Sequence, residues 1–322
     1  MRISTQSFYD QSRTAMGAQQ SNLLRVQQQL GAGTKILAPS DDPLGATRAL
    51  AVSQSIGLNA QYSASRAQAT HNLMLEDGAL TSVTSVLQSV KTGIIEAGNG
   101  TMSDADRATI ATTLESSLAQ LQGLANTDDG NGQFLFAGFK SGSAPFVRDA
   151  SGITYKGDQG QRLLQVDVTR QMAGTDDGRS IFQTLQGGAA YISAAGAAVG
   201  SGADMFSAIS DVIKALRTPV DNAGPAAQAQ LQAALGTANK NITNAHDNVL
   251  TVRASVGSRL QELDALTVTG DSRTLYDKSY LSDLQDLDYA SAMAEFYQRQ
   301  NALQASQQTF VKIQQIALFN YL

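Results

Sequence analysis

The segment YASAMAEFYQRQNALQASQQTFVKIQQIALFNYL (residues 289–322) decides the fold of this chain, because its apolar residues recur every seven positions almost to the last residue. Such spacing keeps an apolar stripe on one side of an α-helix, so the segment predicts a helix that packs against another helix. The stripe consists of Tyr289, Phe296, Leu303, Phe310 and Ala317.

The opposite end of the chain repeats this pattern over residues 4–32, which are predicted to form the first helix. Chain termini usually fray, so long amphipathic helices at both ends favour a role in assembly. The two terminal helices are therefore expected to form a coiled coil. The candidate residues of the assembly interface are Tyr9, Met16, Leu23, Val26, Leu30, Tyr289, Phe296, Leu303, Phe310 and Ile313.

The polar faces of the terminal helices carry glutamine where an exposed helix normally carries charge. Between Phe296 and Leu322 the only charged side chains are Arg299 and Lys312. Uncharged amides suit helices that are buried among copies of themselves, because they avoid the desolvation of ions. We expect these helices to fold on assembly. The alternative is that the two terminal helices form an antiparallel coiled coil within one molecule and pair with no other copy.

Proline and glycine divide the rest of the chain. The loop GTKILAPSDDP (residues 33–43) ends the first helix, and its motif Pro39-Ser40-Asp41-Asp42-Pro43 starts the next, since Asp42 can cap free amides and proline fits the first helical turn. That helix is expected to run to residue 97. Gly270 marks a predicted break at Thr267–Ser272. The other helices are expected at about 103–125, 204–217, 225–266 and 273–322.

A turn-rich stretch after residue 125 precedes short apolar segments that are typical of strands. The strands are expected at Phe134–Phe136, Ile153–Tyr155 and Leu164–Val168. The fold class is therefore mainly α with a small β-rich insert: an elongated rod with a terminal coiled coil, an antiparallel helical bundle and a distal β domain. The expected domains are 1–42 with 267–322, 43–131 with 204–266, and 132–203.

Composition limits the function classes. The chain has 322 residues, with Lys+Arg 23 against Asp+Glu 28 and no basic run, which argues against nucleic acid and anionic membranes as partners. It has no cysteine, no cleavable signal pattern and no run near the roughly 20 apolar residues of a membrane span. Only two histidines occur and no nucleophile elbow is present. We expect no cofactor, no metal and no enzymatic activity.

Several segments identify a family resemblance. The opening MRIST, the loop GTKILAPSDDP, GQFLFAGFKSGSAPF (132–146), YKGDQGQR (155–162) and VLTVRASVGSRLQELD (249–264) are similar to the flagellin family of bacterial flagellar axial proteins. The continuation of Pro43 into Leu44-Gly45 resembles members at the hook–filament junction more than flagellins, which continue DDAAG.

This resemblance implies a structural subunit that is exported unfolded through the flagellar type III apparatus and acts outside the cell. It would form a ring of its own copies between a FlgK-type junction protein and the flagellin filament. A cytosolic export chaperone would bind the last helix at Phe296, Leu303, Phe310 and Leu318. The alternatives are a flagellin that forms the filament itself and a surface-binding module on a helical stalk.

Overall fold

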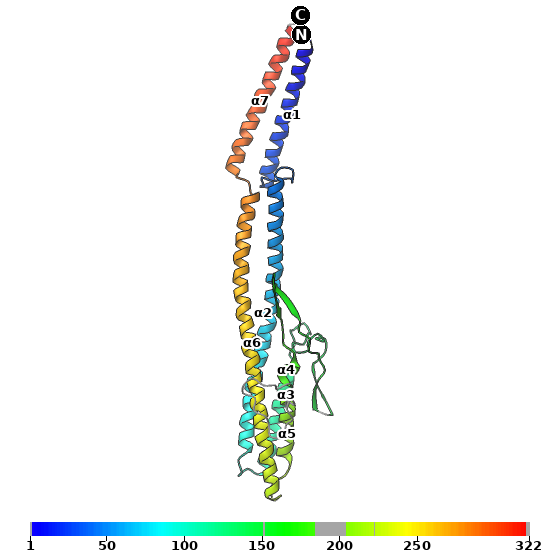
Figure 1. Cartoon of the computed structure of the whole chain (residues 1–322), viewed down its shortest axis with the longest axis vertical. Helices are drawn as coiled ribbons and strands as arrows, with labels where there is room; N and C mark the ends of the chain where they lie inside the picture. Colours follow the sequence, from blue (N-terminus) through cyan, green and yellow to red (C-terminus); the bar gives the residue numbers. More distant parts are fainter. Residues whose placement is uncertain (1, 151, 184–203, 222, 320–322) are drawn as a thin grey trace. The chain divides into compact units, whose positions relative to one another are not determined.

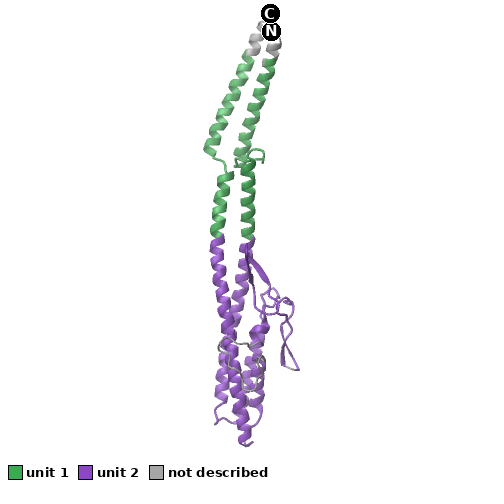
Figure 2. Cartoon of the chain, viewed as in Figure 1, with its two compact units in different colours: residues 1–60, 271–322 green, residues 61–270 purple. Residues whose placement is uncertain are grey.

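The computed structural model describes residues 2–150, 152–183, 204–221 and 223–319, with the side chains of 2–6, 8 and 313–319 outside that description. The chain divides into two compact units, residues 1–60 with 271–322 (unit 1) and residues 61–270 (unit 2) (Figure 2). The helices are α1 Arg2–Ala32, α2 Pro43–Ala97, α3 Asp104–Ala125, α4 Gly178–Phe182, α5 Met205–Arg217, α6 Pro225–Gln285 and α7 Tyr289–Phe319. The prediction of a mainly α fold is confirmed.

Unit 1 contains α1, α7, the beginning of α2 and the end of α6. The helices α1 and α7 lie side by side and antiparallel (Figure 1). This pairing is the terminal coiled coil that the heptad pattern predicts. Near the chain ends, the rings of Tyr9 and Phe310 meet edge to face with centroids 6.0 Å apart.

Unit 2 is built around the remainder of α2 and α6, with α3 and α5 packed beside them (Figure 1). The predicted seven-residue ladder of α2 lies in its core: Leu73, Leu80, Leu87 and Ile94 are all buried. Four phenylalanine rings pack against one another in the core near α4 and α5. They are Phe136, Phe146, Phe182 and Phe206, with neighbouring ring centroids 5.2–6.0 Å apart.

The strands form two separate antiparallel hairpins. In one, β1 (Phe146–Asp149) pairs with β2 (Gly152–Tyr155); in the other, β3 (Leu163–Asp167) pairs with β4 (Arg170–Ala173), with an irregular register between Gln165 and Asp167. The strands predicted at Ile153–Tyr155 and Leu164–Val168 correspond to β2 and β3. The strands β1 and β4 were not predicted, because their residues FVRD and RQMA lack a clear alternation of apolar and polar side chains.

The strand predicted at Phe134–Phe136 is wrong. Its backbone bonds to three different segments: the Phe134 amide donates to Ser141, the Leu135 amide to Thr127, and the Phe136 carbonyl accepts from Gly178. Gly138 then turns the chain with φ +69°, where a Cβ atom would lie 2.3 Å from an Asp158 oxygen. Leu135 and Phe136 are buried in the core. The segment is therefore apolar because it packs in the core, and not because it is a strand.

Within unit 2, the second hairpin packs on the middle of the long helices and not at the α2–α3 connection. Val166 of β3 and Met172 of β4 pack on Ala69 and Leu73, in the middle of α2, and on Val256 and Leu263 of α6. The reason lies in α3, which follows α2 after a short turn and returns antiparallel to it (Figure 1). Its 22 residues carry the chain back by roughly 33 Å before the strands begin. The end of unit 2 at the α2–α3 connection is helical.

The predicted helix break at Thr267–Ser272 does not occur, because α6 continues through it to Gln285. Glycine in a helix costs only about 1 kcal/mol relative to alanine, which tertiary packing can offset, and Gly270 is buried. The interruption falls instead between Gln285 and Tyr289. There the Asp288 carboxylate accepts hydrogen bonds from the Ala290 amide (3.0 Å) and the Ser291 hydroxyl (2.7 Å) and so caps α7.

We predict that Ser103→Ala lowers the free energy of unfolding by about 1 kcal/mol. Ser103 and Asp106 form a reciprocal capping box at the start of α3, in which each side chain bonds the backbone amide of the other. Urea unfolding followed by circular dichroism measures the change. Ser116→Ala is the matched control, since Ser116 is also on α3 but bonds only the carbonyl four residues earlier. An equal effect in both variants would refute the capping explanation.

Candidate assembly surface

The contact between α1 and α7 forms a seam within unit 1, and we call it the terminal seam. Its buried and half-buried positions alternate at spacings of three and four, as in a coiled coil. These positions are Tyr9, Ser12, Met16, Gln19, Leu23, Val26 and Leu30 on α1 and Ala292, Phe296, Arg299, Leu303, Ser306 and Phe310 on α7; Asn22, Gln29 and Gln300 are half-buried beside them.

The terminal seam consists of one apolar row and one largely polar row. The apolar row holds Met16 and Leu23 on α1 and Leu303 on α7, whereas the other row holds Gln19 on α1 and Arg299 on α7. A cavity of about 370 Å³ opens at this polar pair and is lined by Gln19, Glu295, Gln298, Arg299 and Ala302. The Gln19 Oε1 atom is buried there with no hydrogen-bond partner among the described residues. Such a layer weakens a pair of helices, because an unsatisfied buried acceptor costs about 1–3 kcal/mol.

Arg299 finds its counter-charge on its own helix. Its Nε atom donates to a Glu295 carboxylate oxygen at 2.8 Å, and both side chains are part exposed. An ion pair of this kind contributes little to stability. Most seam side chains are only half-buried, with Val26 and Ala292 as the buried exceptions. When only α1 and α7 pair, much of their apolar surface therefore stays exposed.

The loop between α1 and α2 is fastened to the α6–α7 junction, and we call this contact the loop clasp. The Lys35 amide donates to the Gln285 carbonyl (2.8 Å), and the Leu287 amide donates to the Gly33 carbonyl (3.0 Å). The Lys35 ammonium adds a bond to the Asp283 carbonyl (2.6 Å). Gly33 has φ +71°, and a Cβ atom there would lie 2.9 Å from the Tyr289 hydroxyl. The left-handed backbone at this position therefore favours glycine.

The motif residues 39–43 shape the loop from within. The Asp41 carboxylate accepts from the amides of Leu37 (3.2 Å) and Ala38 (3.1 Å). The Asp42 carboxylate accepts from the Gly45 amide (2.9 Å) and so caps α2, with Pro43 in its first turn. Pro39, Ser40 and Pro43 are exposed.

We predict that Asp41→Ala accelerates hydrogen exchange at the Leu37 and Ala38 amides about tenfold, which corresponds to the loss of about 1.4 kcal/mol of local stability. The carboxylate is the acceptor for both amides, so Asp41→Asn, which keeps one oxygen, is expected to exchange more slowly than the alanine variant. Asp10→Ala is the control, because Asp10 is exposed on α1. Unchanged exchange in Asp41→Ala would show that the motif does not hold the loop.

Most of the predicted interface residues lie on the terminal seam, but Tyr289 does not. Met16, Leu23, Val26, Leu30, Phe296 and Leu303 lie on the terminal seam together with the Tyr9–Phe310 pair. Tyr289 is 56% exposed and lies against the loop clasp at Gly33. The side chains of Ile313 and Leu318 lie outside the described residues, although both positions belong to α7.

The loop clasp was missed from the sequence. The one local signal was Asp288, which precedes Tyr-Ala-Ser291 as an N-cap residue precedes a helix. In the structure the Ser291 hydroxyl, followed by the backbone amides, lowers the pKa of Asp288. Lys35 and Gln285 gave no signal, because 250 residues separate them and their bond joins backbone atoms.

The described residues bring together no group of three or more histidine, cysteine, aspartate or glutamate side chains that could hold a metal ion. Among the described helices, none has both the length and the apolar character that a membrane span requires. The chemistry of the terminal seam and the loop clasp is the packing of helices and the pairing of backbone groups.

Comparisons with known proteins agree with this architecture. Residues 3–141 match the family described as the bacterial flagellin N-terminal helical region. Flagellar hook-associated protein 3 of Salmonella typhimurium is 37% identical over 319 residues, covering 99% of each chain, and its Escherichia coli counterpart is 36% identical over the same span. The crystal structure of Xanthomonas campestris FlgL superposes with a TM-score of 0.63 at 20% identity, over 72% of this chain and 99% of that one. The flagellar junction protein FlgL of Legionella pneumophila gives a TM-score of 0.60 at 19% identity, over 74% and 99%.

Proposed function

The chain belongs to the family of flagellar hook-associated protein 3, and from that premise we propose that it is a structural subunit of the junction between the flagellar hook and the filament. The family resemblance inferred from the sequence is thereby confirmed, and the chain is a flagellar protein. The observation that carries the proposal is the terminal seam. Its two helices pair through side chains that remain half-buried, so a further helix has apolar surface to cover.

The proposed assembly is a ring of copies of this chain. One side of the ring would meet a FlgK-type junction protein and the other side flagellin. Residues 1–42 with 267–322 would make the inner contacts of the ring, residues 43–131 with 204–266 would form the rod around them, and residues 132–203 would face outward. The role is structural, with no catalytic step.

We also propose that the subunit acts outside the cell and reaches that place unfolded, without a cleaved signal peptide. Before export, a cytosolic chaperone would cover the apolar row of the last helix at Phe296, Leu303, Phe310 and Leu318. In an unpaired α7 this row is an apolar stripe, and such stripes promote aggregation unless another surface shields them.

Immunogold labelling of isolated flagella in the electron microscope tests the proposal. Label confined to one band where hook meets filament is the expected result. Label along the whole filament would make the chain a flagellin and overturn the junction role. Bulk polymerisation of the purified subunit into long filaments would favour the same alternative, because a ring adaptor does not propagate.

A further inference from the structure

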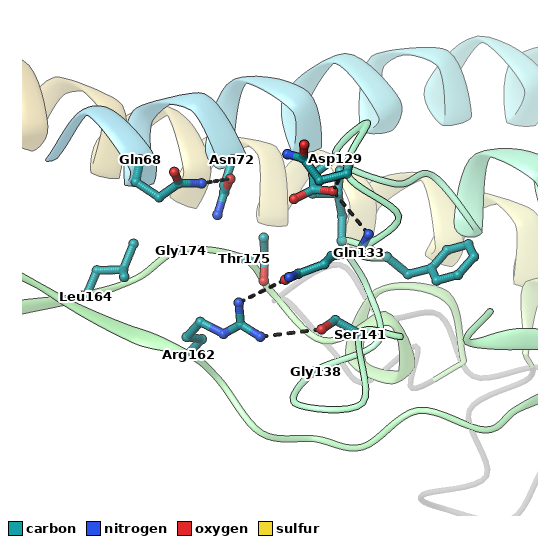
Figure 3. Close-up of a pocket in the computed structure, with 13 residues that line it drawn as sticks. Gln68, Asn72, Asp129, Gln133, Gly138, Ser141, Arg162, Leu164, Gly174 and Thr175 are labelled. Atoms are coloured by element: carbon teal, nitrogen blue, oxygen red, sulfur yellow. Dashed lines mark hydrogen bonds between the residues drawn. The ribbon is translucent and has the colours of Figure 1, made fainter. Parts of the chain in front are cut away.

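A polar cleft lies in unit 2 between α2 and the β-rich segment, away from the terminal seam in the sequence and unused by the assembly proposal. Its volume is about 370 Å³, and Figure 3 shows its polar lining. We call it the amide cleft, after the side chains that line it: Gln68, Asn72, Asp129, Gln133, Ser141 and Arg162.

One wall of the amide cleft comes from α2. Gln68 and Asn72 are one helical turn apart, and the Gln68 Nε2 atom donates to the Asn72 Oδ1 atom at 2.9 Å. This bond fixes both amide groups and uses one donor and one acceptor. The Gln68 oxygen and the Asn72 nitrogen are then left as an adjacent acceptor and donor, and no described residue bonds to them. A pair of neighbouring hydroxyl groups is complementary to such an arrangement.

The opposite wall comes from the loop after α3 and from the start of the second hairpin (Figure 3). Arg162 donates to the Gln133 oxygen at 3.2 Å and to the Ser141 hydroxyl at 3.4 Å. Both contacts are long for hydrogen bonds, so a ligand oxygen can replace them at small cost. Asp129 accepts from the amides of Asn131 (2.9 Å) and Gln133 (3.1 Å) through one oxygen, which leaves its second oxygen as an acceptor.

Hydrogen bonds and an ion pair hold the floor of the cleft in place. The Gly174 amide donates to the Arg162 carbonyl at 3.1 Å, and Arg259 of α6 donates to the Ala173 carbonyl at 3.3 Å. The next turn is held by an ion pair between Arg259 and Asp176 and by a bond from the Asp176 amide to Glu76 (3.3 Å). The cleft is therefore preformed, which lowers the entropy cost of binding.

The chemistry of the lining selects the ligand class. The charges balance, because Asp129 is the one carboxylate and Arg162 the one guanidinium among the lining residues. The remaining polar groups are amides and hydroxyls that both donate and accept, and Leu164, Leu135 and Phe134 add apolar surface. We propose that the amide cleft binds a neutral saccharide, whose hydroxyl edges meet the amides and whose C–H faces meet the apolar side chains. The volume lies near the lower end of ligand pockets, about 300–1,000 Å³, and suits one or two sugar rings.

Ligand-observed NMR on the full-length chain tests this assignment with three neutral probes: maltose, lactose and N,N′-diacetylchitobiose. At least one is expected to bind saturably with a Kd on the order of 1 mM. Asn72→Leu and Arg162→Leu are each expected to weaken that binding about tenfold. Gln88→Leu is the matched control, because Gln88 is exposed on the same helix but does not line the cleft.

Several outcomes would overturn the proposal. They are the absence of saturable binding for all three probes up to about 50 mM, or binding that neither Asn72→Leu nor Arg162→Leu weakens. Preferential binding of the anionic sugar N-acetylneuraminic acid would also overturn it, since it would show that Arg162 rather than the amides selects the ligand. Arg162 is exposed, so its variant is expected to keep the wild-type Tm and to separate loss of binding from loss of folding.

Discussion

Replacing Phe310 by aspartate is expected to remove the subunit from flagella. The Phe310 ring meets Tyr9 across the terminal seam with centroids 6.0 Å apart, and both side chains are half-buried. A carboxylate at this position has no cation facing it among the described seam residues. We expect a cost of about 2–3 kcal/mol per subunit, less than the 3–5 kcal/mol of a fully buried unpaired charge. The cost recurs in every copy of a ring, so incorporation should fall by far more than the roughly 30-fold to 150-fold of a single contact.

Immunogold counts at the junction measure this effect. Phe310→Leu is the control, because it keeps an apolar side chain at the same position of the stripe, and it is expected to incorporate. Leu303→Asp, one heptad away on the apolar row, should reproduce the loss. Removing the last ~20 residues should do the same while unit 2 stays folded, which circular dichroism and hydrogen exchange in its core can verify. Normal junctions built from Phe310→Asp subunits would refute the role of the seam.

Replacing Glu76 by glutamine is expected to stabilise the protein at pH 9 and to remove a large part of the pH dependence of its stability. Glu76 is fully buried in unit 2, and its Oε1 atom has no hydrogen-bond partner among the described residues. The pKa of Glu76 is raised to about 8: burial raises it most, the charge of Asp176 adds to this effect, and the charge of Arg259 lowers it. Glu76, Asp176 and Arg259 meet here, and Asp176 and Arg259 form an ion pair with each other.

The sign of the effect follows from proton binding. The unfolded chain releases the Glu76 proton near pH 4.5, whereas the folded protein keeps it to about pH 8. Between these values the folded state binds more protons than the unfolded state, so the free energy of unfolding falls as pH rises through this window. Above pH 8 the loss is complete, and it is on the order of 3–5 kcal/mol. Glutamine has the same shape and no proton to lose.

Urea unfolding at pH 5, 7 and 9 compares wild type with Glu76→Gln. The wild type is expected to lose stability across this series, and the variant is expected to lose much less. Glu96→Gln is the matched control, because Glu96 is exposed on the same helix, and it should follow the wild type. Parallel curves for wild type and Glu76→Gln would show that Glu76 ionises in the folded protein as it does in the unfolded chain.

The Glu76 cluster also explains how a hairpin keeps its place on a helix. Asp176 follows β4, and its amide bonds Glu76 of α2 while its carboxylate pairs with Arg259 of α6. The cluster therefore ties the turn after β4 to both long helices of unit 2. A pH rise that ionises Glu76 should loosen this turn first, which hydrogen exchange at the Asp176 amide can follow.

The sequence by itself determined the long helices and their buried faces. The ladder through Leu73, Leu80 and Leu87, the start of α2 at Pro43 and the Ser103 cap of α3 all follow from interactions between residues at most a few turns apart. Such interactions are written in local spacing, which is why the stretch at residues 289–322 was sufficient to predict a helix paired along one stripe.

Only the tertiary structure decided the interruption at Asp286–Asp288, the loop clasp, the place of the hairpins beside α2 and the amide cleft. Each depends on partners that are distant in the sequence: Lys35 bonds Gln285, Arg66 bonds the Val166 carbonyl, and Glu76 meets Asp176. Backbone hydrogen bonds are nearly independent of side-chain type, so the sequence gives little sign of them. Burial changes the pKa of a glutamate, but the sequence alone does not show which glutamate is buried. Local pattern therefore determined the buried faces of the helices, and long-range packing determined where α6 ends and the sites that lie between the helices.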